Sequence, residues 1–305
     1  MSSSLDDYLA ELSDLSKPLA ISKLANLSEL TPEEIDSFDG KWPDIDVERR
    51  RQITGQLVEL VEDNVELEFD AIFRSCLADS DVVVRARAVE GLGLTEERSA
   101  IDPLVDLLLK DEDYNVRAAA AGALGKFAMQ AELGKLPQSD ANKVEEALLA
   151  AFNSSAEHYT VRCRVLEAIS PLERPFIDDM IRQAYRSDTF EFQVSAIYSM
   201  GRNCNPGWLP ILLKELRSPN AQLRFEAARA CGELEEEEAV SHLLELTHDN
   251  DAEVQMSAIE ALGRIGGDEA REVLQEFLES PSESVREAAQ DALDEIGFWD
   301  DPASL

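Results

Sequence analysis

The chain has 305 residues, and its 44% hydrophobic content excludes a wholly disordered polypeptide. Because 63 acidic residues stand against 28 lysines and arginines, the formal net charge is −35, which argues against nucleic-acid or anionic-membrane binding over the whole surface. No run approaches the roughly 20 apolar residues of a membrane-spanning helix, and the N-terminus carries acidic residues where a secretory signal carries lysines and an apolar run, so we expect a soluble protein.

Residues 1–66 are predicted to form a helical N-terminal cap. Two short helical patterns occupy residues 4–30. Thr31 and Pro32 begin the next helix, with threonine as its cap and proline at the first helical position. A longer helix is expected over residues 46–61.

Three consecutive arginines, Arg49 to Arg51, stand out in so acidic a chain. They could form a site for a phosphate or an acidic partner. They could also be an exposed helix face balanced by Asp44, Asp46 and Glu48. The nearby carboxylates favour the exposed, non-functional face.

A sequence phrase then recurs down the chain, in its clearest form as Asp113 to Gly125. It indicates a turn followed by a helix, with Asp113 as the cap and apolar residues on one helical face. Related stretches occur at residues 81–93, 157–170, 188–201, 220–232, 251–263 and 282–294. Their valine-like positions are 31 or 32 residues apart, except for one step of 45 that indicates an insertion near residues 132–140. A fixed period of this size predicts a repeat array.

Each repeat is predicted to be a pair of helices, because one amphipathic pair cannot bury its apolar face without its neighbours. The second helix carries the phrase, and the first helices are expected near residues 68–78, 100–110, 140–153, 174–187, 207–217, 237–247 and 268–279. The insertion is expected to lengthen a loop without breaking the stack. Glycines near the end of the phrase are expected to take a left-handed conformation that ends the helix. They are Gly93, Gly125, Gly201, Gly232 and Gly263.

An arginine follows the valine-like position in most of the phrases. Its guanidinium could bridge the acidic or polar caps within and between repeats, or the row of arginines could bind anions. The caps lie close in sequence, as Asp81 does to Arg85, and this favours the structural role. The row consists of Arg85, Arg117, Arg162, Arg224 and Arg286.

The phrase Asp-x-x-Val-Arg-x-x-Ala-x-x-Ala-Leu-Gly resembles the HEAT repeat, in the short form of phycobilisome-lyase-like proteins. The resemblance covers roughly residues 67–296. It implies an all-α, armadillo-type α-solenoid of about seven helix pairs, preceded by the divergent cap of residues 1–66 and followed by an acidic aromatic tail, residues 297–305. In that tail, Phe298 and Trp299 precede two aspartates and could fold back over the last repeat or serve as a short docking motif. HEAT arrays mostly serve as binding scaffolds, with a few enzymes among them.

Candidate chemistry is sparse. Deoxyhypusine hydroxylase resembles this fold and holds a di-iron site with repeated His-Glu dipeptides, but here His158, His242 and His248 are not followed by glutamate, so such a site has almost no ligands. Bilin lyases resemble the chain at the level of repeats, and no residue set marks bilin binding; Cys163 is more readily a small helix residue than a thiol near a ligand. The charge argues against a HEAT-like DNA glycosylase, which needs a basic groove. We predict no catalytic residues, no metal and no cofactor.

The outer side of the second helices offers a binding surface. At 100° per residue, positions two and six after the valine-like residue point away from the core, and in HEAT arrays this side resembles the concave face of the solenoid. Apolar residues occupy it in three neighbouring repeats, flanked by arginines, a combination typical of protein-binding hot spots. Tight curvature could instead bury them against the next repeat. The set comprises Val194, Tyr198, Phe225 and Met256 with Arg164, Arg202, Arg229 and Arg264.

These patterns predict a non-catalytic scaffold or adaptor that holds a partner protein, as a helix or an extended peptide, on the concave face. The acidic C-terminal half could attract a basic segment of that partner. The four cysteines lie far apart, without metal-ligand spacing, and suit free thiols in a reducing cytoplasm. A bilin lyase-like, tetrapyrrole-binding protein and a structural assembly subunit stay open as alternatives.

Overall fold

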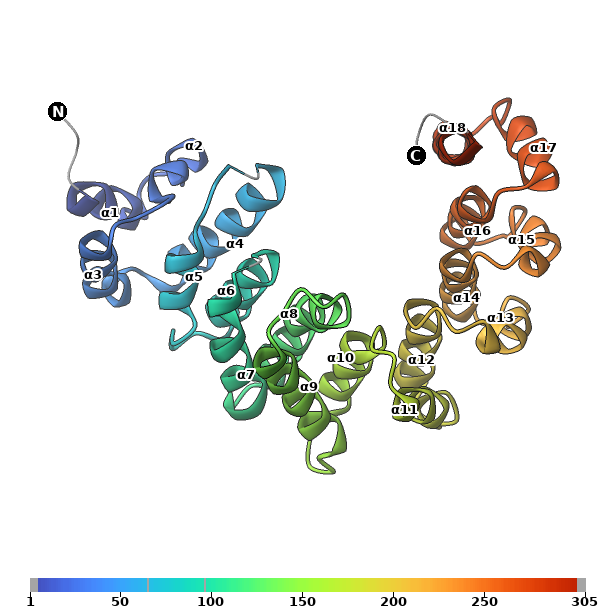
Figure 1. The fold of residues 1–305 in the computed structure, drawn as a ribbon. Helices are drawn as coiled ribbons and strands as arrows, with labels where there is room; N and C mark the ends of the chain where they lie inside the picture. The colour runs from blue at the N-terminus through green and yellow to red at the C-terminus, as the bar shows by residue number, and fades with distance from the viewer. Residues whose placement is uncertain (1–4, 65, 96, 301–305) are drawn as a thin grey trace. The chain divides into compact units, whose positions relative to one another are not determined.

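The computed structural model describes residues 5–64, 66–95 and 97–300, except for the side chains of Asp6, Phe298, Trp299 and Asp300. Within these ranges the chain forms eighteen α-helices, five short 3-10 helices and no strand (Figure 1). The predicted all-α array of about seven helix pairs is confirmed. No described helix has both the length and the apolar character to span a bilayer. The helices fall into two compact units, residues 1–169 and 170–305, which we call the N-terminal and C-terminal units.

The N-terminal unit begins with four helices and continues with three helix pairs. The first four are α1 (Leu5–Ser13), α2 (Ile21–Leu24), α3 (Pro32–Lys41) and α4 (Val47–Asp63). The pairs are α5 (Asp70–Cys76) with α6 (Val82–Leu94), α7 (Ile101–Lys110) with α8 (Tyr114–Glu132), and α9 (Gln138–Asn153) with α10 (Tyr159–Ile169). Helix α4 packs on α6, α6 on α8 and α8 on α10, so α4 occupies the place of a second helix before the first repeat.

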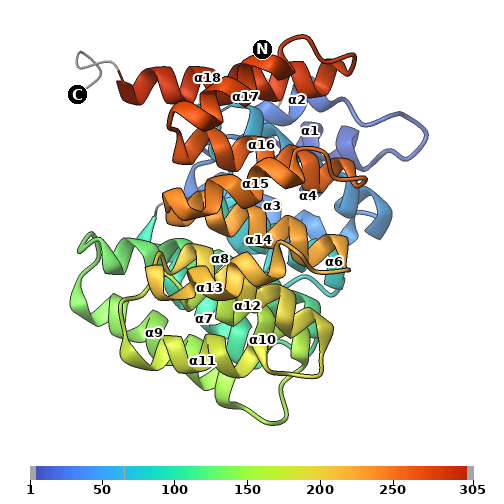
Figure 2. The ribbon, with the colours of Figure 1, turned by 90° about the vertical axis from the view of Figure 1, so that its right-hand side faces the viewer.

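The C-terminal unit contains four helix pairs. They are α11 (Pro175–Tyr185) with α12 (Phe190–Arg202), α13 (Leu209–Glu215) with α14 (Ala221–Leu234), α15 (Val240–Leu246) with α16 (Ala252–Ile265), and α17 (Asp268–Phe277) with α18 (Glu283–Asp300). The first helices α11, α13, α15 and α17 lie one above another in one layer (Figure 2), and the second helices form the layer behind them. The predictions for Phe298 and Trp299 in the tail concern side chains outside those that the structure describes.

Polar caps and buried valines position the second helices as the phrase predicts. The Asp251 carboxylate accepts hydrogen bonds from the main-chain N–H groups of Glu253 and Val254, which satisfies two otherwise unpaired donors at the start of α16. Val254 itself is completely buried. The same cap at Asp81 starts α6.

The 45-residue step is accommodated differently from the expectation. Helix α8 extends to 19 residues and α9 to 16, so only residues 133–137 remain between them. The insertion therefore lengthens two packed helices rather than a loop. Residues 126–132 are mostly good helix formers, so α8 continues through them. Each residue added to an existing helix gains one backbone hydrogen bond.

The glycines of the phrase do not take the left-handed conformation that the sequence analysis predicted for them. The described glycines with positive φ are Gly134, Gly266 and Gly267, whereas the phrase glycines lie inside helices. A Cβ on Gly232 would come within 2.9 Å of the Cα of Ala261 on the next second helix. Glycine is needed because neighbouring helices approach too closely for any side chain.

The arginine row is structural, with partners that differ from those expected. Arg224 donates two hydrogen bonds of 2.8 Å to the Asp249 carboxylate in the turn of the next repeat, and a third to the main-chain carbonyl of Ser218. Arg85 does the same with Asp111 and the carbonyl of Asp79. Arg85, Arg117 and Arg224 thus each join a main-chain carbonyl six residues earlier to a carboxylate of the following repeat, rather than bridging the cap four residues before them. Arg162 and Arg286 donate to main-chain carbonyls of their own repeats, those of Phe152 and Ser280.

The three consecutive arginines do not form an exposed helix face. Arg49 and Arg50 are buried, and Arg50 donates to Asp79 at 2.7 Å. Arg51 pairs with Asp81 through two hydrogen bonds of 2.6 and 3.0 Å. Because α4 packs on α6 as a second helix does, Arg50 and Arg51 contact the acidic turn of the first repeat. These ion pairs connect the N-terminal cap to the repeat array.

Candidate partner-binding face

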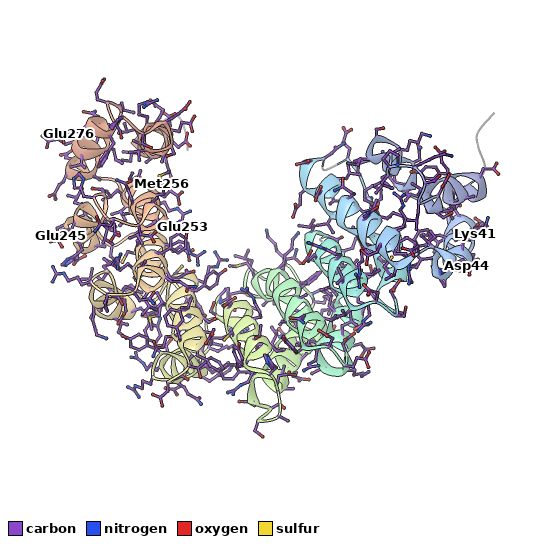
Figure 3. The ribbon with its side chains drawn as sticks, turned by 180° about the vertical axis from the view of Figure 1, so that it is seen from behind. Lys41, Asp44, Glu245, Glu253, Met256 and Glu276 are labelled. Carbon is purple, nitrogen blue, oxygen red and sulfur yellow. The ribbon has the colours of Figure 1, made fainter. Side chains whose placement is uncertain are left out.

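The predicted site falls on the outer side of three consecutive second helices, α12, α14 and α16, of the C-terminal unit. We call this side, turned away from α11, α13 and α15, the second-helix face. Figure 3 shows Met256 and Glu253 on this side of α16, with Glu245 of α15 and Glu276 of α17 on the opposite side. Local helix geometry produces this separation, because Val254 is buried and Met256 stands two positions further around the helix.

The four apolar residues of the predicted patch are all half-buried. Val194 and Tyr198 are one turn apart on α12, Phe225 lies on α14 and Met256 on α16. Helices α14 and α16 are in contact here, and the Ser257 hydroxyl donates to the main-chain carbonyl of Phe225 at 3.2 Å. The patch is neither an open hydrophobic surface nor a closed core, so part of each side chain stays accessible to a partner.

The flanking arginines have distinct roles. The Arg229 guanidinium lies 4.2 Å from the ring centroid of Tyr198 and pairs with Glu226 at 3.2 Å, so it covers the patch rather than bordering it. Arg202 is half-buried and Arg264 is exposed. Neither forms an ion pair with a carboxylate among the described residues, which leaves both cations free for a partner. Arg164 lies on α10 in the N-terminal unit, where it pairs with Glu167 at 2.6 Å.

Acidic side chains border the patch on its C-terminal side. Exposed carboxylates occupy positions on α16 and α18 that face the same way as the patch, and three of them stand at the outward positions two and six of the phrase. They are Glu253, Glu260, Glu287 and Asp291. Helix α16 therefore carries both Met256 and Arg264 of the predicted set and two of these carboxylates, and the other two follow on α18.

Three of the four cysteines have a raised thiol pKa. Burial raises the pKa of Cys231 to about 12 and that of Cys76 well above its usual value. The pKa of Cys204 is also raised, mainly by desolvation and then by the Glu233 carboxylate. Because the thiolate is the nucleophile, these shifts disfavour nucleophilic chemistry at the three cysteines.

The histidines have separate local partners. His242 lies 3.2 Å from Arg217, His248 packs near Phe277, and His158 accepts a hydrogen bond from the main-chain N–H of Thr160 at the start of α10. Over the described part of the chain, no cluster of three histidine, cysteine or acidic side chains could hold a metal ion.

Comparison with known proteins gives a family and a fold. A family model of HEAT repeats matches residues 71–152, 177–263 and 209–294. No curated protein matches the chain. The CpcE–CpcF complex of phycocyanin lyase from Nostoc sp. PCC7120 is similar in structure, with 17% identity, 88% of this chain and 95% of that chain covered, and a TM-score of 0.53. The karyopherin Kap121p, bound to the extreme C-terminus of the protein phosphatase Cdc14p, is also similar in structure, with 17% identity and a TM-score of 0.53. The match covers 96% of this chain and 36% of the Kap121p chain. At such identities the likeness concerns the fold alone.

Proposed function

Because the chain belongs to the HEAT-repeat family, we propose that it is a non-catalytic scaffold or adaptor that holds a partner protein on its second-helix face. Arrays of stacked repeats offer extended surfaces for binding. The observation that carries the proposal is the grouping of half-buried apolar residues with Arg202 and Arg264, which form no ion pair within the described part of the chain, on consecutive second helices. The free thiols of the described cysteines fit a cytoplasmic location.

The proposed partner segment is an extended peptide or a helix that crosses α12, α14 and α16. Its apolar side chains would contact Tyr198, Phe225 and Met256, and its basic side chains would lie toward α18. Protein binding by solenoids of this fold supports the proposal: CpcE and CpcF form a complex with each other, and Kap121p binds a C-terminal segment of Cdc14p.

The test is capture of partners from native lysate at low and moderate salt by the wild type and by Phe225→Asp. Leu244→Asp is the matched control, because Leu244 is also half-buried but lies on α15, a first helix. A protein retained by the wild type and by Leu244→Asp, and lost by Phe225→Asp, supports the scaffold. Retention by all three variants places binding elsewhere. Melting curves of both variants separate loss of binding from loss of folding.

The bilin-binding alternative is tested in the same preparation. Mixing the purified protein with a linear tetrapyrrole and recording visible absorbance distinguishes it from the scaffold, because a bound bilin changes its spectrum. An unchanged spectrum together with retained partner supports the scaffold alone.

A further inference from the structure

A pocket of about 710 Å³ opens in the N-terminal unit. Its walls are the segment between α1 and α2, residues 15–21, together with α4 and the first turns of α6. The volume is in the range of about 300–1,000 Å³ that holds small-molecule ligands. The pocket is independent of the second-helix face, which lies in the C-terminal unit.

Apolar side chains at this pocket are unusually exposed. Leu15 is 56% exposed, Ile21 46% and Val83 40%. Together they are three of the eight large apolar side chains that are exposed within the described residues, and all three line the pocket. Three exposed apolar side chains around one concavity form a surface that an apolar ligand would stabilise by removing it from water.

The charged residues that line the pocket are all cationic, although acidic residues outnumber basic ones more than two to one in the sequence. They are Lys17, Arg49, Arg51 and Arg87. Arg51 is held by the two hydrogen bonds to Asp81 and is not available to a ligand. The Lys17 and Arg87 side chains are 63% and 50% exposed.

The ion pairs of those two exposed cations are local. Lys17 pairs with Asp14 at 3.1 Å and Arg87 with Glu90 at 2.6 Å, each three residues away in sequence. Exposed pairs of this kind contribute little to stability. A ligand anion can therefore replace either carboxylate at small cost.

Arg49 leaves a positive charge uncompensated in the pocket wall. It is 3% exposed, and its guanidinium donates to the main-chain carbonyls of Asp14 and Lys17 rather than to a carboxylate. Its Nε is buried without a hydrogen-bond partner in the described structure. A buried charge without a counter-charge is unfavourable, so an anion in the adjoining pocket would lower the free energy of the folded state.

We propose that this pocket binds a small amphipathic anion. The apolar body of the ligand lies against Leu15, Ile21 and Val83, and its single anionic head, a carboxylate or a phosphate, pairs with Lys17 or Arg87. The shared chemistry is one anionic group joined to an apolar chain or ring.

The experiment is calorimetric titration of the full chain with octanoate and with octyl phosphate. Octanol and octyltrimethylammonium provide the neutral and cationic controls of the same chain length. We expect either anion to bind at least tenfold more tightly than both controls, and the stronger of the two identifies the preferred head group. Absence of binding by both anions at millimolar concentration, or equal binding of the cation, overturns the proposal.

The variants test the assigned residues. Lys17→Glu with Arg87→Glu should weaken anion binding at least tenfold and should make octyltrimethylammonium the better ligand. Lys110→Glu with Lys135→Glu is the matched control, because both lysines are exposed outside the pocket and the total change in net charge is the same. Equal weakening by this control variant would assign the effect to the overall charge and contradict the pocket. Leu15→Ser, which leaves every cation in place, should weaken both anions.

Discussion

The guanidinium carbon of Arg229 on α14 lies 4.2 Å from the ring centroid of Tyr198 on α12, so a cation of one repeat covers the aromatic face of the preceding one. The same arginine pairs with Glu226 at 3.2 Å. This arrangement stabilises the row of second helices and at the same time limits how much of Tyr198 a partner can reach.

Arg229→Met tests that contact. The substitution keeps an unbranched side chain of similar length but removes the charge, so we expect a loss of about 0.5–2 kcal/mol in the free energy of unfolding. Arg264→Met is the control, since Arg264 is exposed and has no such contact among the described residues. Urea denaturation measures both, and equal effects would show that the stacking adds no stability.

Gly232→Ala tests the close approach of second helices. Alanine favours helix by about 1 kcal/mol over glycine, but its Cβ would lie 2.9 Å from the Cα of Ala261. Overpacking of this kind costs about 1–3 kcal/mol, so we expect net destabilisation in urea. Gly122→Ala has no atom within 4 Å of the new Cβ and should stabilise instead. The same sign for both variants would contradict the packing explanation.

The sequence predicted the architecture well because the repeat phrase encodes its own helix pairs. Buried Val254 and the Asp251 cap behave as the pattern requires. The structural role of the arginine row was predicted correctly, but its partners and the conformation of the phrase glycines were not, for a common reason. The glycine conformation and the arginine partners both depend on how closely the next repeat packs, as Ala261 packs against Gly232. The packing distance between repeats is set by tertiary structure and cannot be predicted from residue spacing within one repeat.

The two candidate sites also depend on packing between helices that the sequence did not predict. Helical spacing placed Phe225 and Met256 on the outer side of their helices, but their half-burial depends on how neighbouring second helices pack. The N-terminal pocket was not predicted, because it forms only where α4 packs on α6 and where Arg49 of α4 binds the carbonyls of Asp14 and Lys17 in the segment that carries Leu15. The three consecutive arginines were its one sequence signal, and their burial could not be read from composition.

Stability at low pH tests the inter-repeat ion pair. Hydrogen bonds from Arg224 hold the pKa of Asp249 below its usual value, so the pair stabilises the fold above the unfolded-state pKa of about 3.9 and this contribution is lost as pH falls through the lower folded-state pKa. Asp249→Asn keeps an acceptor for the Asp251 N–H but removes the charge. We expect a loss of about 3 kcal/mol at pH 7 and a shallower decline of stability below pH 4. A variant with the wild-type slope would show that other carboxylates control acid unfolding.

The carboxylates of α16 and α18 predict where the basic segment of a bound partner lies on the second-helix face. Exposed Glu260, Glu287 and Asp291 lie on these two helices, whereas Arg202 lies on α12 and Arg264 on α16. Reversing the acidic end with Glu260→Lys and Glu287→Lys should weaken a partner with a basic segment and reduce the salt dependence of its affinity. Fluorescence anisotropy of the labelled partner segment at two salt concentrations measures both effects. Glu245→Lys with Glu276→Lys changes the net charge equally on the first-helix side, so a comparable loss there would assign the attraction to the total charge and not to this face.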